Sequence, residues 1–296
     1  MADKEPKIQS YGVMINPVPA NHSEKGENSL IQFYVTGDGS FWIRVNCPQS
    51  DGGDAGETNT PNKLKDLLYR ILDIKSPDDL QVQEVASEVK ATVTEEEDLK
   101  WFVEELCTHA YKDRVFTPVA AKLFGLIAQH HAGDIKIRDL LMRRVQDEYD
   151  KRLDLLNKDR YRFVTSALFL GEVYHQVKIG KSPFRVLVGP VLKYLDMIIE
   201  PHLAGDSNEN VDDDMIVVSK QLLQSGVDLH ESKADAVEAL VLKVTEVFCR
   251  CQLTAATRLN LVAALADLWP LLAKGNISLR TQHASLAAKL GVSLHI

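Results

Sequence analysis

The sequence predicts an all-α fold, a solenoid of antiparallel helix pairs, with a short N-terminal β-hairpin in an otherwise flexible arm. From Thr60 onward, apolar residues recur three and four positions apart, which is the period of a helix with one buried face. Many of the predicted helices begin at a Ser-Pro or Thr-Pro pair and are joined by short polar links. Short links favour antiparallel neighbours, so each helix pair is expected to bury one face on the next pair.

The chain divides into an arm, a helical domain and a tail. Residues 1–59 are predicted to form the arm, because 1–29 are polar and 50–59 have the composition of a linker. Within the arm, two β-rich runs flank Gly37-Asp38-Gly39, which predicts a hairpin over 31–45. Residues 60–273 form the predicted repeat domain, and 274–296 a short helix and tail.

The helix starts are predicted from capping residues and N1 prolines. The domain is predicted to contain no strand, and one long helix is expected to run from Asp134 to Leu156. Each helix pair spans about 35–45 residues, the size of a HEAT-type unit. The predicted start signals are, in chain order, Thr60-Pro61, Ser76-Pro77, Thr94 with Glu97, Thr117-Pro118, Asp134, the break at 157–159 and Ser182-Pro183, followed by helices at 213–225, 232–250, 254–273 and 278–290.

Charge and cysteine content limit the class of protein. The formal net charge of −8 argues against broad, nonspecific nucleic-acid binding, which needs a basic surface. The N-terminus is charged and lacks an apolar run, and no window is apolar enough to span a membrane. The four cysteines are sparse and irregularly spaced, which favours a reduced compartment, the cytoplasm, with the nucleus as a second location.

No catalytic motif stands out, so the chain is predicted not to be an enzyme and to need no cofactor or small-molecule substrate. The nearest approach to a metal site is His130, His131 and Asp134, yet a site needs three or four convergent ligands. The Cys249-x-Cys251 pair lacks a second pair at zinc spacing. Its residues are predicted to be structural, with Cys249 against the core and Cys251 directed away from it.

A cluster of basic residues between Lys136 and Arg162 is the main candidate for function. Acids are interleaved with them, so the cluster is either a salt-bridged surface or a recognition patch for an acidic protein surface or RNA phosphate. Glu172 lies in an apolar run, as a buried, paired acid or as part of a partner-binding edge. The candidate partner-binding residues are Arg143, Arg144, Lys151, Arg152, Arg160, Arg162 and Glu172.

Two motifs resemble a known family. The run Arg138-Asp-Leu-Leu-Met-Arg-Arg-Val-Gln-Asp-Glu-Tyr149 is similar to a helix of the middle domain of translation initiation factor 4G (MIF4G). The run Arg162-Phe-Val-Thr-Ser-Ala-Leu-Phe-Leu-Gly-Glu-Val-Tyr174 looks like the next helix, at the expected spacing. Val145 stands where that family often has Cys. The resemblance covers about residues 60–270 and is strongest to the small single-domain members.

The resemblance implies a HEAT-repeat fold and a non-catalytic scaffold in translation initiation or its regulation. The implied partners are a DEAD-box RNA helicase (initiation factor 4A), subunits of initiation factor 3, RNA or an mRNA-binding protein. Two alternatives remain open from the sequence. One is direct RNA binding in mRNA metabolism, and the other is a helical metal-dependent hydrolase that uses His130, His131 and Asp134.

Overall fold

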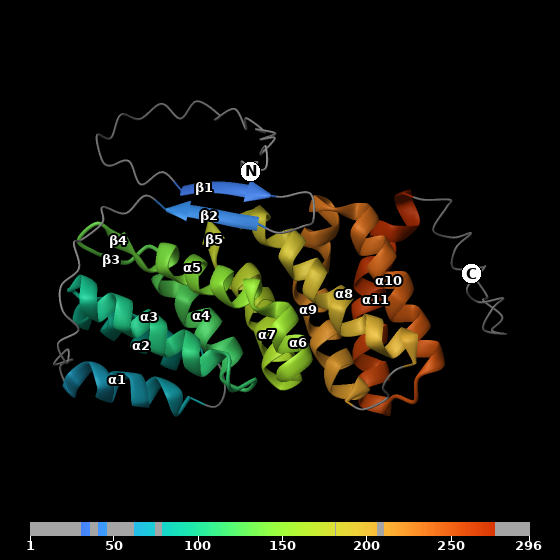
Figure 1. The fold of residues 1–296 in the computed structure, drawn as a ribbon, viewed down its shortest axis with the longest axis horizontal. Coiled ribbons are helices and arrows are strands. Elements are labelled where there is room, and N and C mark those ends of the chain that lie inside the picture. Colours follow the sequence, from blue (N-terminus) through green and yellow to red (C-terminus); the bar gives the residue numbers. More distant parts are fainter. Residues whose placement is uncertain are drawn as a thin grey trace, which may run out of the picture.

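The protein is a two-row array of helices (Figure 1). The computed structural model describes residues 31–35, 41–45, 62–74, 79–180, 182–205 and 210–275. The first row contains α1 Asn62–Leu72, α3 Glu96–Ala110, α5 Ile137–Asp150, α8 Val188–Ala204 and α10 Ala234–Arg250. The second row contains α2 Asp79–Thr92, α4 Thr117–Ile127, α7 Arg160–Gln176, α9 Val211–Ser232 and α11 Ala255–Gly275. The short α6 Arg152–Lys158 connects α5 to α7.

The second row is continuous from end to end. In it α2 packs on α4, α4 on α7, α7 on α9 and α9 on α11. Each first-row helix is followed by a second-row helix, and the resulting pairs are the repeats of the predicted solenoid. The all-α solenoid predicted from the apolar periodicity is therefore confirmed. One contiguous core of buried apolar side chains extends from Leu64 on α1 to Leu268 on α11.

Helix α7 lies at the centre of this core. Every residue from Phe163 to Tyr174 is buried, so the helix is covered on all sides by its neighbours. Phe169 meets the ring of Tyr111 edge-on at a centroid distance of 5.1 Å, and Phe163 lies 5.3 Å from Tyr194. Such aromatic contacts add specific geometry to the burial of apolar area. The apolar run that the sequence marked out is thus the middle of the molecule.

The predicted N-terminal hairpin is present. Strand β1 Ile31–Val35 pairs antiparallel with β2 Phe41–Val45, with Phe33 opposite Ile43. Strand β2 lies alongside α5 (Figure 1). The turn predicted at Gly37-Asp38-Gly39, most of the predicted arm and the predicted helix at 278–290 lie outside the described residues.

The prediction that no strand interrupts the domain is wrong. Two short antiparallel ladders occur, β3 His131–Ala132 with β4 Ile135–Lys136, and β5 Lys178–Ile179 with β6 Ser182–Pro183. The first turns at Gly133, whose φ of +54° lies in the left-handed region that glycine tolerates. Ladders of two residues are too short to show a period of two in the sequence, so no pattern could reveal them.

Several predicted helix starts are also wrong. Helix α3 begins after Glu95 with no side-chain cap, so Thr94 and Glu97 form no capping box. Asp134 lies in the β3–β4 turn, and α5 begins after Lys136. Ser182-Pro183 forms β6 and not a helix start; a 3₁₀ turn at Arg185–Leu187 leads into α8. In each case a tertiary contact or a ladder determines where the chain becomes helical, and the local signal does not.

The long helix predicted from Asp134 to Leu156 is divided. Helix α5 ends at Asp150, and α6 begins at Arg152 after a change of direction at Lys151.

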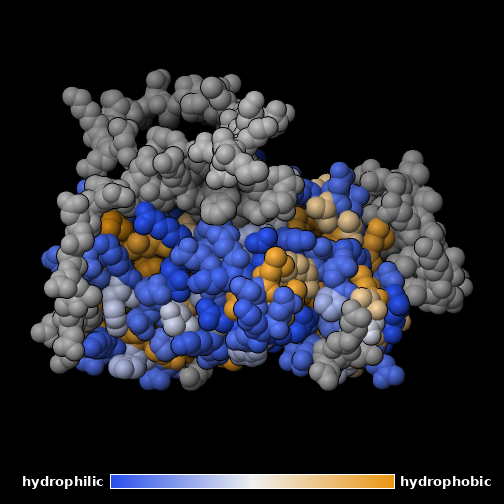
Figure 2. All heavy atoms as spheres, viewed as in Figure 1, coloured by the Kyte–Doolittle hydropathy of each residue, from blue (hydrophilic) through white to orange (hydrophobic). Residues whose placement is uncertain are grey.

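Among the described helices, none is both long and apolar enough to cross a membrane. Hydrophilic side chains cover most of the face shown in Figure 2, with separate hydrophobic areas between them.

The closest approach of α4 to α7 depends on Gly125. A Cβ at this position would lie 2.7 Å from the backbone oxygen of Gln176. We expect Gly125→Ala to destabilise the fold by about 1–3 kcal/mol through overpacking, despite the higher helix propensity of alanine. Gly189→Ala on α8 is the control, because its Cβ would meet only Lys233 Nζ at 3.5 Å. Chemical denaturation measures both, and equal stability of the two variants contradicts the prediction.

Candidate partner-binding surface

The structure distributes the predicted basic cluster over three consecutive helices. Arg143 and Arg144 lie on α5, Lys151 lies between α5 and α6, and Arg152 begins α6. Arg160 and Arg162 lie in the first turn of α7. All but Lys151 are partly buried. The contacts of each residue therefore decide how much of the cluster is available to a partner.

Two of these arginines are engaged by acids of their own chain. Arg144 Nε lies 2.8 Å from Glu104 Oε2 on α3. Arg162 donates to both carboxylate oxygens of Glu148 on α5, at 2.7 and 2.9 Å. Hydrogen bonding to Glu148 raises the pKa of Arg162 above its ordinary value. Because the carboxylate of Glu148 is buried, Arg162 neutralises a charge that water does not reach.

The remaining members differ in their exposure. Arg152 donates to the backbone oxygen of Tyr149 at 3.1 Å, and its guanidinium lies 4.1 Å from the centre of the Tyr149 ring. This contact is a cation–π interaction that orders the start of α6. Lys151 is exposed, and among the residues that the structure describes no carboxylate pairs with it. Lys151 is therefore the most accessible cation of the predicted patch.

Glu172 is a buried acid with an internal partner. Its side chain is fully buried, and Oε1 lies 2.8 Å from Lys220 Nζ on α9. The pair connects the C-terminal half of α7 to the middle of α9. This arrangement agrees with the first of the two interpretations, a paired structural acid.

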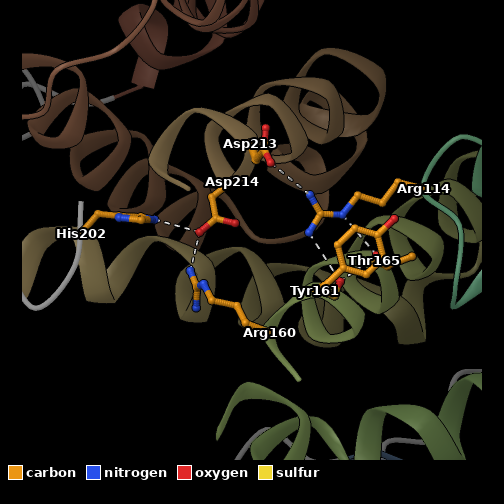
Figure 3. A network of polar contacts seen from close by, with 7 residues as sticks. All are labelled: Arg114, Arg160, Tyr161, Thr165, His202, Asp213 and Asp214. Carbon is orange, nitrogen blue, oxygen red and sulfur yellow. Dashed lines mark hydrogen bonds and ion pairs between the residues drawn. The ribbon is translucent and has the colours of Figure 1, made fainter. Parts of the chain in front are cut away.

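Arg160 belongs to a polar network at one end of the helices (Figure 3). It forms an ion pair with Asp214 in the first turn of α9 and donates to the backbone oxygen of Ile198 at 3.4 Å. His202 Nε2 on α8 approaches the same Asp214 carboxylate at 2.9 Å. Asp214 and His202 are both buried. One carboxylate thus holds α7, α8 and α9 together.

The network continues on both sides of Asp214. Arg114, just before α4, donates to Thr165 Oγ1 on α7 at 3.2 Å and lies 3.9 Å from Asp213 on α9. On the other side, Asp212 accepts hydrogen bonds of 2.9 Å from the backbone N–H and the hydroxyl of Thr254, which precedes α11. We call this set the polar edge; its members are Arg114, Arg160, Thr165, His202, Asp212, Asp213, Asp214 and Thr254.

The polar edge shows that four second-row helices point the same way. Apart from Thr165 in the second turn of α7 and His202 near the C-terminal end of α8, its members lie at the N-terminal ends of α7, α9 and α11 and immediately before α4. Parallel helices place the positive ends of their dipoles side by side, which is unfavourable. The three aspartates at the start of α9 offset that charge. The residues that these aspartates contact lie far away in the sequence, so a local pattern could not reveal the network.

The residues of the predicted metal site do not converge. His130 Nε2 lies 2.7 Å from the backbone oxygen of Val93, His131 lies on β3, and Asp134 follows the turn at Gly133. His130 and Asp134 would share a helix face only if α4 continued through both residues, but α4 ends at Ile127. Within the part of the chain that the structure describes, no group of three His, Cys, Asp or Glu side chains could hold a metal.

The predicted orientation of the cysteine pair is reversed. Cys249 is exposed and Cys251 is buried, with its sulfur 4.0 Å from the backbone oxygen of His202. Helix α10 ends at Arg250, and Cys251 adopts an extended conformation with φ −91° and ψ 150°. The extended backbone turns the Cys251 side chain back toward the core, which a helical reading of the two positions could not predict.

Three cations that were not among the predicted partner-binding residues line a groove between α8 and α10. Its volume is about 400 Å³, and Arg185, Lys193 and Lys233 line it beside apolar residues. All three cations are exposed. Lys233 is distant in sequence from the other two, so no local cluster revealed them. Only the packing of α8 on α10 brings them together.

These features define the class of protein as an α-helical-repeat protein with open surfaces. No protein-family model matches the chain. Curated relatives do. Over 225 residues it is 27% identical to a "CBP80/20-dependent translation initiation factor" of Xenopus tropicalis, which covers 73% of this chain. It is 25% and 24% identical, over 154 residues, to the "MIF4G domain-containing protein" of Mus musculus and of Homo sapiens.

These relatives support a MIF4G-type family for the chain, as the motifs on α5 and α7 predict. The chain spans 37% of the length of the Xenopus tropicalis protein and 67% of the length of the mouse protein. The match to the mouse protein covers 51% of this chain. The similarity to the mouse protein therefore extends over about half of this chain.

The buried carboxylate of Asp214 is shared by Arg160 and His202, so stability should depend on it more than on the exposed acids beside it. We expect Asp214→Ala to lower the free energy of unfolding by about 3 kcal/mol, because it leaves Arg160 and His202 without their shared acid. Asp213→Ala, one residue away, removes a mostly exposed carboxylate and should change stability by less than about 0.5 kcal/mol. Urea unfolding followed by circular dichroism measures both; equal losses would exclude a special role for Asp214.

The contact of Asp212 predicts a pH-dependent contribution to stability. Hydrogen bonds from Thr257 and Thr254 hold the pKa of Asp212 below its ordinary value. A depressed pKa contributes stability above the unfolded pKa of about 3.9, and this stability is lost as the pH falls through the folded pKa. Asp212→Ala should therefore lower the Tm at pH 7, and the difference from the unmodified chain should shrink below about pH 4. A difference that stays constant with pH contradicts this account.

Proposed function

We propose that the chain is a non-catalytic adaptor in the regulation of mRNA translation initiation. The observation that carries this proposal is the similarity to the "CBP80/20-dependent translation initiation factor", which extends over 225 residues, 73% of this chain. The names of the MIF4G relatives support the same role. The described surface carries exposed charged and apolar residues, which suits binding to other macromolecules.

The proposed mechanism is to hold partner surfaces in a fixed relative geometry. Internal ion pairs hold α5 on α7 within one repeat, at Glu148–Arg162, and link α7 to α9 of the next repeat, at Asp214–Arg160 and Glu172–Lys220. Pairs of this kind, with one buried partner, resist sliding of one helix past another because separation leaves a buried charge alone. A stiff array with exposed helix ends and loops is a surface on which two partners can be held at once.

The proposed partners are those that the family resemblance implies. They are a DEAD-box RNA helicase (initiation factor 4A), initiation factor 3 subunits, or an mRNA-binding protein, in the cytoplasm and with the nucleus as a second location. Lys151 is the member of the sequence-predicted patch on which we place this contact, because it is exposed and lacks an internal acid among the described residues. Direct RNA binding is the second candidate, supported by the same exposed cation and opposed by the net charge of −8.

Affinity purification of the tagged full chain from cells, followed by mass spectrometry, tests the proposal. We expect initiation factor 4A or initiation factor 3 subunits to co-purify and to remain after RNase treatment. Lys151→Glu should reduce their recovery about two- to fivefold, since reversal of a rim charge mainly slows association. Lys65→Glu on α1 is the control, an exposed lysine at the far end of the array.

The outcomes separate the two candidates. Recovery of no initiation factor contradicts the adaptor function. Complete loss of the initiation factors after RNase treatment indicates that RNA bridges them and supports direct RNA binding. Equal recovery with Lys151→Glu and Lys65→Glu removes Lys151 from the contact surface while leaving the adaptor function in place.

A further inference from the structure

The groove between α8 and α10 follows one face of each helix. Lining positions recur three or four residues apart from Lys233, the residue before α10, along the helix at Ala236, Leu240 and Lys243. This spacing is that of neighbours on one helix face, so about ten residues of α10, roughly 15 Å, border the groove. A volume of about 400 Å³ over that length is sufficient for one or two large side chains.

The groove is open because the residues that approach it are small. Gly189 on α8 and Ala236 and Ala239 on α10 line it, and both alanines are exposed. A Cβ added at Gly189 would meet nothing closer than Lys233 Nζ, at 3.5 Å. The side chains of Pro190 and Leu240 are buried and form an apolar floor. The chain thus leaves apolar surface accessible between two packed helices.

The rim of the groove carries an excess of positive charge. Arg185, Lys193 and Lys233 are exposed, and among the described residues no carboxylate lies within 4.0 Å of any of them. Lys243 is different, because it pairs with Asp196 and Glu200 at one side. In a chain with a net charge of −8, three cations without acids around one apolar groove are an exception that folding does not require.

We propose that this groove binds a short peptide segment of a partner protein in which one or two large apolar side chains are flanked by aspartate or glutamate. The apolar side chains would fill the space over Pro190 and Leu240, and the carboxylates would pair with Arg185, Lys193 and Lys233. The proposal specifies how the adaptor holds a partner and rests on the adaptor function in that respect.

RNA fits the groove less well than an acidic peptide. No aromatic residue lines the groove, so bases would find no ring on which to stack. Only three cations without acids surround it, whereas backbone recognition of a nucleic acid commonly uses more phosphate contacts. The exposed small residues and the buried floor favour apolar side chains.

Selection from a library of random 15-residue peptides displayed on phage, with the full chain immobilised, tests the proposal. We expect enriched peptides to carry a large apolar residue with aspartate or glutamate within four positions. Synthetic copies of the enriched peptides should bind at least tenfold more weakly to the double variant Lys193→Glu, Lys233→Glu. They should also lose binding to Ala236→Trp, which fills the groove without altering the rim charge.

The control is the double variant Lys65→Glu, Lys90→Glu, which makes the same change of charge at exposed positions on α1 and α2. Binding that is equally weakened by both double variants, peptides without acids, or no enriched peptide at all each overturn the proposal. So does tighter binding of a 20-nucleotide unstructured RNA at the same residues. If peptides bind in the groove while no initiation factor co-purifies from cells, peptide binding is supported and the proposed adaptor function is contradicted. If initiation factors co-purify while no peptide binds in the groove, the adaptor function is supported and the groove proposal is contradicted.

Discussion

The burial of α7 on every side is the constraint on which the rest of the structure depends. From Phe163 to Tyr174 this helix has no solvent face, so a polar residue there needs a partner inside the molecule, and the partly buried cations of its first turn also take internal partners. Arg162 meets Glu148, Glu172 meets Lys220 and Arg160 meets Asp214. These pairs fix how α5 and α9 lie against α7, and the neighbouring repeats then extend the array in both directions.

The same constraint explains how far the sequence could lead. The run from Phe163 to Tyr174 shows a buried helix directly, because its composition is apolar throughout. The basic cluster around it could not be divided into paired and accessible members, since Glu104 and Asp214 lie far from Arg144 and Arg160 in the chain. Cap signals failed at Thr94, Asp134 and Ser182 for the related reason that they are local, whereas neighbouring elements decide where a helix begins.

Charge is divided between two tasks along the array. At the centre, cations and acids neutralise each other. These ion pairs fix the relative orientation of the helices more than they add to the free energy of folding. Between α8 and α10 the cations surround small residues and an apolar floor. Among the described residues, no carboxylate forms an ion pair with Lys193 or Lys233. The paired charges at the centre and the cations at the groove therefore belong to different sets of residues, so the frame can stay fixed while the groove accepts the proposed peptide.

The linear order of the second row has a consequence for local unfolding. In such an array each helix pair is stabilised by its nearest neighbours, and among the described helices the pairs α1–α2 and α10–α11 have one neighbouring pair each. Helices α1 and α11 should therefore open most often and α7 least often, so the amides of α7 exchange with solvent mainly through global unfolding. The groove lies one interface from the end formed by α11. A molecule bound between α8 and α10 would reduce local unfolding at that end, because a ligand that binds only the folded form shifts the opening equilibrium toward it.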